Sequence, residues 1–308
     1  MASARNSIDK TFMFGGDVVT GDAGIDYIVG GAGGGTTLNG GAGFDYFSFK
    51  DSFNAAGSTI NGGANSGEFL FSGNAATPST FDMRAATITN IQELQISGSN
   101  GIGGGGAPNS VAVTIGSNQL GSGKIESNFR LGLFGPNTQL TIVDQAPTQA
   151  STIDLRGVGA YYLNPESGVV VTDASAATTS KQLYAPAFNS VLVGGSGSDF
   201  LQGGAGNDAL AGGDGVDVLI GGDGVDTLFG NAGTDTLWGS YGADGAGDQL
   251  YGGDGSDTYF LYELTDTVTE TNSSAAVGGV DLVYSSNPDH ASDLSKTRLA
   301  VAQGAEIA

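Results

Sequence analysis

The sequence predicts an all-β protein whose chain winds into a parallel β-roll or β-solenoid, and three observations support this. A nine-residue phrase, Gly-Gly-x-Gly-x-Asp-x-Leu-x, runs three times in tandem over residues 203–229. The chain holds 55 glycines among its 308 residues, a composition that suits turns better than helices. Short runs of apolar and β-branched residues, separated by Gly, Asn, Pro and Ser, make up much of the remainder.

The phrase divides into a turn and a strand. Its six residues Gly-Gly-x-Gly-x-Asp suit a tight turn, because glycine adopts left-handed backbone angles without a Cβ clash. The three residues x-Leu-x form a short strand whose middle side chain faces one side of the sheet. Two phrases, about 18 residues, then complete one coil, and stacked coils lie about 4.8 Å apart. The predicted interior ladder consists of Leu201, Leu210, Leu219, Leu228, Leu237, Leu250 and Tyr259.

Aspartates recur with the same period in the C-terminal repeat segment, residues 191–260. Asp244 continues the register, four extra residues ending at Asp248 follow it, and Asp257 closes the series. Residues about 18 apart stack on one edge of the coil, so two columns are expected. One column contains Asp199, Asp217 and Asp235, with Asp257 as a further member, and the other contains Asp208, Asp226 and Asp244.

A column of carboxylates at this spacing repels itself, so a cation is expected between successive coils. Carboxylates and inward-facing glycine carbonyls form an all-oxygen shell, which suits calcium better than magnesium because calcium tolerates irregular geometry. The absence of cysteine and the single histidine argue against zinc, copper and iron. The sequence therefore predicts several Ca²⁺ ions. The candidate ligands are the aspartates of the two columns, Asp248, and Gly194, Gly195, Gly197, Gly203, Gly204, Gly206, Gly212, Gly213, Gly215, Gly221, Gly222 and Gly224.

The first segment, residues 1–71, carries a degenerate copy of the phrase. Asp17 and Asp26 are nine residues apart, Gly35 stands where the next aspartate is expected, and Asp45 restores the pattern. All three aspartates are candidate ligands. Because one carboxylate is missing, we expect one good site here, between the turns of Asp26 and Asp45.

The middle segment, residues 72–190, loses the phrase and is expected to be strand-rich and solenoid-like. Its predicted strands lie in the runs ATITNIQELQIS, VAVTI, FRLGLF, TQLTIVD, STIDLRG and GVVVTD. No long Pro-rich or charged linker separates the segments, which favours one continuous β structure. Residues 261–308 are expected to cap the repeats.

The tandem phrases over residues 194–260, and more loosely those over 14–48, resemble the RTX (repeats-in-toxin) family, also called hemolysin-type calcium-binding repeats. Asp266, Val268, Glu270 and Asp281 are similar to the family's post-repeat pattern. The middle segment resembles the strand-rich parts of bacterial surface and S-layer-like RTX proteins. The resemblance implies folding on contact with extracellular calcium, and type I secretion guided by a C-terminal signal. The tail TRLAVAQGAEIA is the candidate for that signal.

Composition and charge exclude several partners. The formal net charge of -22 repels nucleic acid and anionic membranes. No stretch approaches about 18 consecutive apolar residues, so no membrane span is expected. The start, MASARNSIDKTFMFGGD, lacks the apolar core of an N-terminal signal peptide. Without calcium the same charge is expected to keep the chain loose, so that metal binding supplies folding free energy.

The predicted function is that of a secreted or cell-surface calcium-binding structural protein that self-associates into a layer, filament or matrix. It is not predicted to be an enzyme, because no Gly-x-Ser-x-Gly or His-Glu-x-x-His motif occurs and His290 is expected to lie in a surface loop. Two alternatives stay open: a folding and export module of a secreted enzyme or adhesin, and a polysaccharide-modifying enzyme in the middle segment. Cell-surface polysaccharide is a further candidate partner.

The ninth position of the phrase is expected to point outward and to form an aromatic ridge. This ridge either contacts a partner or is covered by other parts of the chain. On alternate sheets it gives two sets, Ile220 with Trp238 and Phe260, and Phe229 with Tyr251. Asn231 and Ser240 replace the second glycine of their turns. Asn tolerates left-handed angles, so Ser240 is the predicted weaker position.

Overall fold

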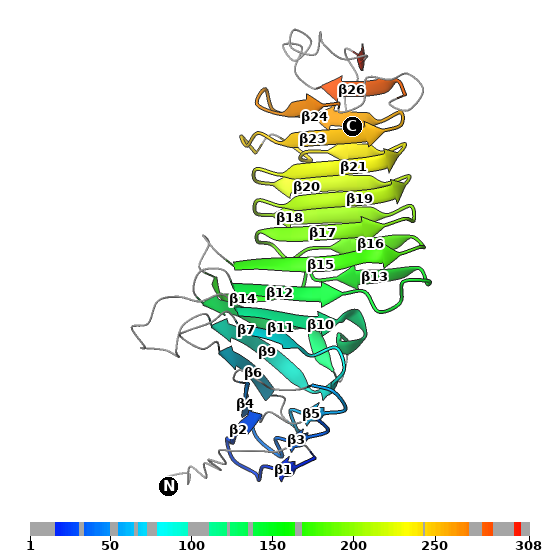
Figure 1. Ribbon diagram of the computed structural model, residues 1–308. Coiled ribbons are helices and arrows are strands. Elements are labelled where there is room, and N and C mark those ends of the chain that lie inside the picture. The colour runs from blue at the N-terminus through cyan, green and yellow to red at the C-terminus, as the bar shows by residue number, and fades with distance from the viewer. Residues whose placement is uncertain are drawn as a thin grey trace. The chain divides into compact units, whose positions relative to one another are not determined.

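The computed structural model describes residues 16–30, 34–49, 55–64, 67–72, 79–97, 111–121, 124–134, 138–163, 168–242, 244–270, 279–285 and 299–302. The predicted surface loop around His290 and most of the proposed C-terminal signal lie outside these residues. The described chain is built almost entirely of parallel β-strands, with one 3₁₀ turn, Ser117–Gln119, and no α-helix (Figure 1). The predicted all-β solenoid is therefore confirmed. Within this part of the chain, no helix has the length and apolar character needed to cross a membrane.

The chain forms two compact units, residues 1–145 with 157–170 and residues 146–156 with 171–308. In the first unit, three parallel ladders run in the orders β1-β3-β5-β8, β7-β10-β12 and β2-β4-β6-β9-β11-β14. Their bounds are β1 (Val18–Thr20), β2 (Tyr27–Gly30), β3 (Thr37–Asn39), β4 (Asp45–Phe49), β5 (Thr59–Asn61), β6 (Gly67–Ser72), β7 (Ser79–Asp82), β8 (Thr87–Thr89), β9 (Ile91–Ser97), β10 (Val111–Gly116), β11 (Ile125–Phe134), β12 (Thr138–Val143) and β14 (Gly159–Leu163).

In the second unit, two parallel ladders run in the orders β15-β17-β19-β21-β23-β25 and β13-β16-β18-β20-β22-β24-β26-β27. Figure 1 shows their strands stacked as successive rungs. The bounds are β13 (Ser151–Asp154), β15 (Gly168–Ala177), β16 (Lys181–Tyr184), β17 (Ser190–Gly195), β18 (Phe200–Ala205), β19 (Ala209–Gly215), β20 (Val218–Asp223), β21 (Thr227–Gly233), β22 (Thr236–Trp238), β23 (Gln249–Asp254), β24 (Thr258–Leu261), β25 (Thr267–Thr269), β26 (Asp281–Ser285) and β27 (Leu299–Ala302).

Strand pairing confirms that two phrases make one coil. Leu201 pairs with Leu219 across β18 and β20, and Leu210 pairs with Leu228 across β19 and β21. The seven predicted ladder residues, from Leu201 to Tyr259, are all 0% exposed. Burial of a continuous leucine ladder supplies the hydrophobic stabilisation that such short strands lack individually.

The middle runs also form strands, as predicted. Each of the six predicted runs overlaps at least one strand, and ATITNIQELQIS contains both β8 and β9. The largely aliphatic core of the first unit also contains a cluster of aromatic side chains. Phe47, Phe49, Phe69 and Phe71 are 0% exposed, and their rings contact one another at centroid distances of 5.0–5.9 Å.

Candidate calcium-binding turns

The phrase aspartates occupy one place in the fold, directly before a strand. Asp208 precedes β19, Asp217 precedes β20 and Asp226 precedes β21. Charged side chains are rarely buried without a partner, yet these three are between 0% and 3% exposed. The same holds for Asp199, Asp235, Asp248 and Asp257. The sequence thus places a row of carboxylates in the interior.

Each buried aspartate is fixed by a hydrogen bond to the neighbouring coil. The backbone N–H of Asp199 donates to Oδ1 of Asp217, and that of Asp208 donates to Oδ1 of Asp226, both at 2.7 Å. The pattern repeats along both edges at 2.7–3.0 Å. The first column is Asp199, Asp217, Asp235, Asp257 and Asp281, and the second column is Asp208, Asp226, Asp248 and Asp266.

The prediction that Asp244 continues the second column is wrong. Asp226 N–H donates to Asp248 Oδ1 at 2.9 Å, whereas Asp244 is exposed and its Oδ2 accepts from Gly224 N–H at 2.7 Å. The cause is the four-residue insertion, which forms a loop before β23. The residue directly before the strand takes the column position, and that residue is Asp248. Asp257 belongs to the first column, as expected.

The second oxygen of seven column aspartates has no hydrogen-bond partner. This applies to Oδ2 of Asp199, Asp208, Asp217, Asp226, Asp235, Asp248 and Asp257, all of which are inaccessible to solvent. A buried, unsatisfied carboxylate oxygen is costly. A regular series of such oxygens indicates that a cation completes the structure.

The backbone around these oxygens leaves room for an ion and supplies further oxygens. A Cβ on Gly203 would lie 2.4 Å from Asp208 Oδ2, and one on Gly221 would lie 2.2 Å from Asp226 Oδ2. Any side chain at the first glycine of the phrase would therefore fill this space. Gly194 and Gly212 lie in the same relation to their own aspartates.

Carbonyl oxygens of the later glycines point along the stack toward the next coil. A Cβ on Gly213 would lie 1.9 Å from Gly195 O, and one on Gly215 would lie 2.2 Å from Gly197 O. Gly222 and Gly224 lie in the same way over Gly204 and Gly206. The turns thus bring carboxylate and carbonyl oxygens close to the next coil, and oxygen donors of this kind suit calcium.

The two substituted turns behave differently from one another. Asn231 adopts φ +76° at the place where Gly213 has φ +116°, as expected for an asparagine. Ser240 was predicted to be a weak position, but it is 1% exposed and its Oγ donates to Gly242 O at 2.6 Å. Its turn opens into the insertion, so no left-handed angle is required of it.

The N-terminal repeats bring Asp26 and Asp45 together, at the place predicted for a single site. Asp26 N–H donates to Asp45 Oδ1 at 3.0 Å, and both residues are 0% exposed. Oδ1 of Asp26 and Oδ2 of Asp45 lack partners. These two turns therefore repeat the geometry of the C-terminal columns.

Asp17 lies on the opposite edge, where the residues stacked on it, Thr36 and Ser58, are uncharged. Val18 pairs with Thr37, so Thr36, rather than the expected Gly35, takes the aspartate position above Asp17. Thr36 N–H donates to Ser58 Oγ at 3.3 Å, as the aspartates do to carboxylates. The coil here is 19 residues long, one more than two phrases, which moves Gly35 out of place.

Two clusters beyond the repeats hold three carboxylates each, with oxygens within 4.8 Å of one another. They are Asp248, Glu263 and Asp266, and Asp257, Glu270 and Asp281. Sequence reasoning noted Asp266, Glu270 and Asp281 only as part of a family pattern and missed Glu263. Asp266 directly precedes β25, so the aspartate-before-strand signal could have identified it. Glu263 does not directly precede a strand, so this signal does not identify it. It reaches the cluster because the chain passes back over the insertion.

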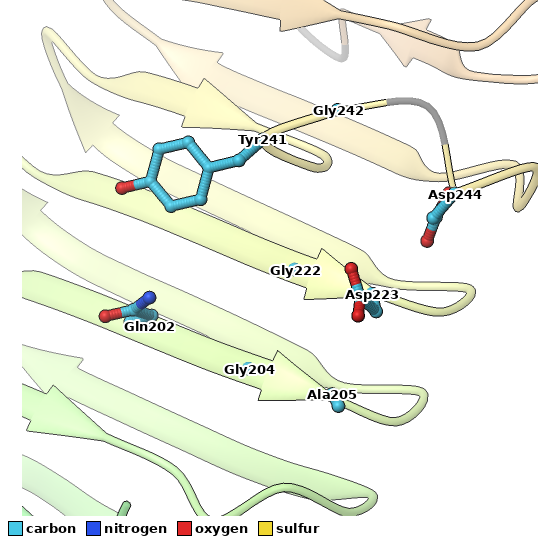
Figure 2. Close-up of a pocket in the computed structure, with 8 residues that line it drawn as sticks. All are labelled: Gln202, Gly204, Ala205, Gly222, Asp223, Tyr241, Gly242 and Asp244. Carbon is cyan, nitrogen blue, oxygen red and sulfur yellow. The ribbon is translucent and has the colours of Figure 1, made fainter.

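The insertion also forms a shallow hollow of about 280 Å³ on the outer face of β18 and β20. Figure 2 shows Tyr241 at one end, and Asp223 with Asp244 at the other. Gly204 and Gly222 form part of its floor. Tyr241 is 60% exposed.

Burial raises the pKa of the column aspartates from Asp199 to Asp257. It raises the pKa of Asp208 to about 8, with added repulsion from Asp226. It raises the pKa of Asp217 and Asp248 to about 7, and that of Asp226, Asp235 and Asp257 to about 6. At neutral pH and without metal, the columns therefore resist full ionisation.

These shifts predict the pH dependence of the metal-free fold. Because the folded state binds protons more tightly than the unfolded state, stability is greatest below about pH 4 and falls as the pH rises through about 6 to 8. Urea unfolding of chelator-treated protein, followed by circular dichroism at about pH 5 and about pH 8, should show the lower midpoint at the higher pH. Saturating calcium should reverse this order, because the ligands bind metal when deprotonated. A metal-free protein that gains stability from about pH 5 to about pH 8 would contradict this account.

Comparison with known families agrees with this geometry. The family model of the RTX calcium-binding nonapeptide repeat matches four times, over residues 187–219, 212–246, 220–259 and 245–268. No curated protein gives a match. The matched stretch contains both aspartate columns up to Asp266. The second unit of this chain therefore carries RTX calcium-binding nonapeptide repeats, which bind several Ca²⁺ ions.

Proposed function

We propose that this chain is an exported structural protein that folds when calcium enters its aspartate columns and then self-associates outside the cell. RTX repeats in a β-solenoid fit a calcium-binding exported protein. The observation that carries the proposal is the row of buried aspartate oxygens without partners. Metal binding to such a row contributes directly to folding free energy.

The residues that would hold the ions follow from the two columns. In each layer, Oδ2 of an aspartate from Asp199 to Asp257 and carbonyl oxygens of the glycine turns would ligate calcium, as Asp26 and Asp45 would in the first unit. Bound calcium supplies positive charge and six to eight coordination positions for oxygen. The chain supplies the rest, because Oδ1 holds each carboxylate in place through the neighbouring N–H.

The difference in calcium concentration between the cytosol and the outside of the cell, and the negative charge of the chain, support folding that is triggered by calcium. A chain of net charge -22 repels itself where free calcium is scarce, as in the cytosol. Extracellular calcium-binding modules typically work at dissociation constants of about 10⁻⁴–10⁻³ M, so ordering would follow export. An unfolded chain in the cell also suits passage through a secretion channel.

The aromatic ridge supports self-association. Trp238 stacks on Phe260 at a centroid distance of 3.8 Å, and Phe260 stacks on Tyr284 at 5.0 Å. On the alternate sheet Phe229 stacks on Tyr251 at 4.9 Å, and Phe229 is 39% exposed. Ile220, by contrast, is only 3% exposed. Trp238, Tyr251, Phe260 and Tyr284 are half-buried, and partly exposed aromatic rows of this kind are typical of interaction surfaces.

The first unit holds an acid pair of the kind a polysaccharide-acting enzyme would need. Glu68 pairs with Glu93 across β6 and β9, and burial, together with the Glu93 charge, raises the pKa of Glu68 to about 7. Arg130 Nη1 lies 3.6 Å from Glu93 Oε2. The two glutamates are 5% and 7% exposed, so a polymer would not reach them, and we favour the structural function.

The ligand assignment is tested by replacing one column oxygen. Asp217→Asn keeps an acceptor for the Asp199 N–H but removes the charge, so it should bind at least one calcium ion fewer and shift the folding midpoint to about tenfold higher calcium. The control is Asp214→Asn, an exposed residue of the same turn. Equilibrium dialysis gives the stoichiometry. Equal losses in both variants would count against the columns.

Self-association is tested by a calcium titration of metal-free full chain, with circular dichroism and light scattering recorded together. A transition to β structure accompanied by rising scattering supports the whole proposal. A transition without scattering at any protein concentration would instead favour a monomeric folding and export module. A fully β metal-free protein that calcium leaves unchanged would contradict calcium-driven folding.

A further inference from the structure

Lys181 occupies the aspartate position one coil before Asp199. Gln182 pairs with Phe200 across β16 and β18, which places Lys181 level with Asp199. Lys181 N–H donates to Asp199 Oδ1 at 2.7 Å, just as each aspartate N–H donates to the next carboxylate. The first column therefore begins with a cation in the chain itself.

The ammonium group of Lys181 is enclosed by oxygens. The residue is 1% exposed. Its Nζ donates to Ala146 O at 2.7 Å, to Ser151 Oγ at 3.1 Å, and to Gln149 O. Two backbone carbonyls and one hydroxyl thus satisfy the three donors of the ammonium.

Backbone hydrogen bonds fix the register of the turns that form this enclosure. Thr178 N–H donates to Pro147 O, and Ser196 N–H donates to Ala177 O, both at 2.8 Å. Three successive turns therefore stack position by position. They are residues 146–151, 176–181 and 194–199.

The oxygens around the ammonium match the ion-facing positions of the repeat turns. In this register Ala146 corresponds to Gly194, Gln149 corresponds to Gly197, and Ser151 corresponds to Asp199. In the repeats, carbonyl oxygens of the first and third glycines also approach the neighbouring coil, since a Cβ on Gly194 would lie 2.3 Å from Gly212 O and one on Gly215 would lie 2.2 Å from Gly197 O. The aspartate adds its unpartnered oxygen. The ammonium therefore lies in the layer where a further ion would be expected.

We propose that the Lys181 ammonium takes the place of the first calcium ion of the first column. It provides positive charge to the carbonyl oxygens of Ala146 and Gln149, and it begins the first column with a cation in place of a carboxylate. Metal binding then starts in the layer between Asp199 and Asp217. The second column has no such cation, because Ser190 stands at its start and its Oγ donates to Phe188 O at 2.6 Å. This inference rests on the proposed function, since it assumes ions between the coils.

The test is to exchange the lysine for a ligand in the full chain. Lys181→Asp restores the column carboxylate, so it should bind one calcium ion more than the wild-type chain by equilibrium dialysis. Lys181→Met removes the cation without adding a ligand. It should bind the wild-type number of ions and unfold at a lower temperature in saturating calcium, because its oxygen enclosure loses a partner. Ser180→Asp, at the exposed neighbouring residue, controls for an added carboxylate and should keep the wild-type number.

The outcomes separate a failure of this inference from a failure of the proposed function. An unfolded Lys181→Met variant, with a Lys181→Asp variant that calcium refolds, would be the strongest support. The inference is overturned if Lys181→Asp binds the wild-type number of ions or fails to fold in calcium. It is also overturned if Lys181→Met is as stable as the wild-type chain. A wild-type chain that binds no calcium would instead overturn the proposed function.

Discussion

The structure depends on stacking aspartates in the interior at the spacing of successive β-coils. In the seven column carboxylates from Asp199 to Asp257, one oxygen accepts from the N–H of the coil before it and the other has no partner. The first oxygen fixes the side chain and the second demands a cation. Burying like charges is costly, so the columns favour bound calcium, and metal binding adds to the stability of the fold.

The other two recurring features of the phrase, its glycines and its leucine, serve this arrangement. Glycine is needed at Gly203 because a Cβ would occupy the space beside Asp208 Oδ2, and at Gly213 because the carbonyl of Gly195 points at it. The leucine ladder holds the two sheets together once the turns have closed. Neither short strands nor glycine turns would be stable alone, so ordering of one coil supports ordering of the next.

The sequence predicted the fold, the coil period, the leucine ladder and most of the column, because each follows from a strict period. The sequence pattern assigned Asp244 to the second column, because it does not show on which side of the column aspartate the four inserted residues lie. The start of β23 shows that Asp248 takes the column position. Thr36 replaced Gly35 because one extra residue shifts the register. Glu263 was not predicted because no regular spacing marks it, and only the folded chain brings it to the second column. Lys181 lies 18 residues before Asp199, at the regular column spacing, but a lysine does not match the aspartate of the phrase.

The central claim is that calcium lies between the coils, beside the unpartnered oxygens. The most direct measurement is a crystal structure of the calcium-loaded protein with anomalous diffraction data. We expect anomalous peaks along both edges, contacting Oδ2 of Asp208 and Asp226 in the second column and of Asp217 and Asp235 in the first. Calcium found only at exposed carboxylates such as Asp223 and Asp244, with the column oxygens metal-free, would contradict it.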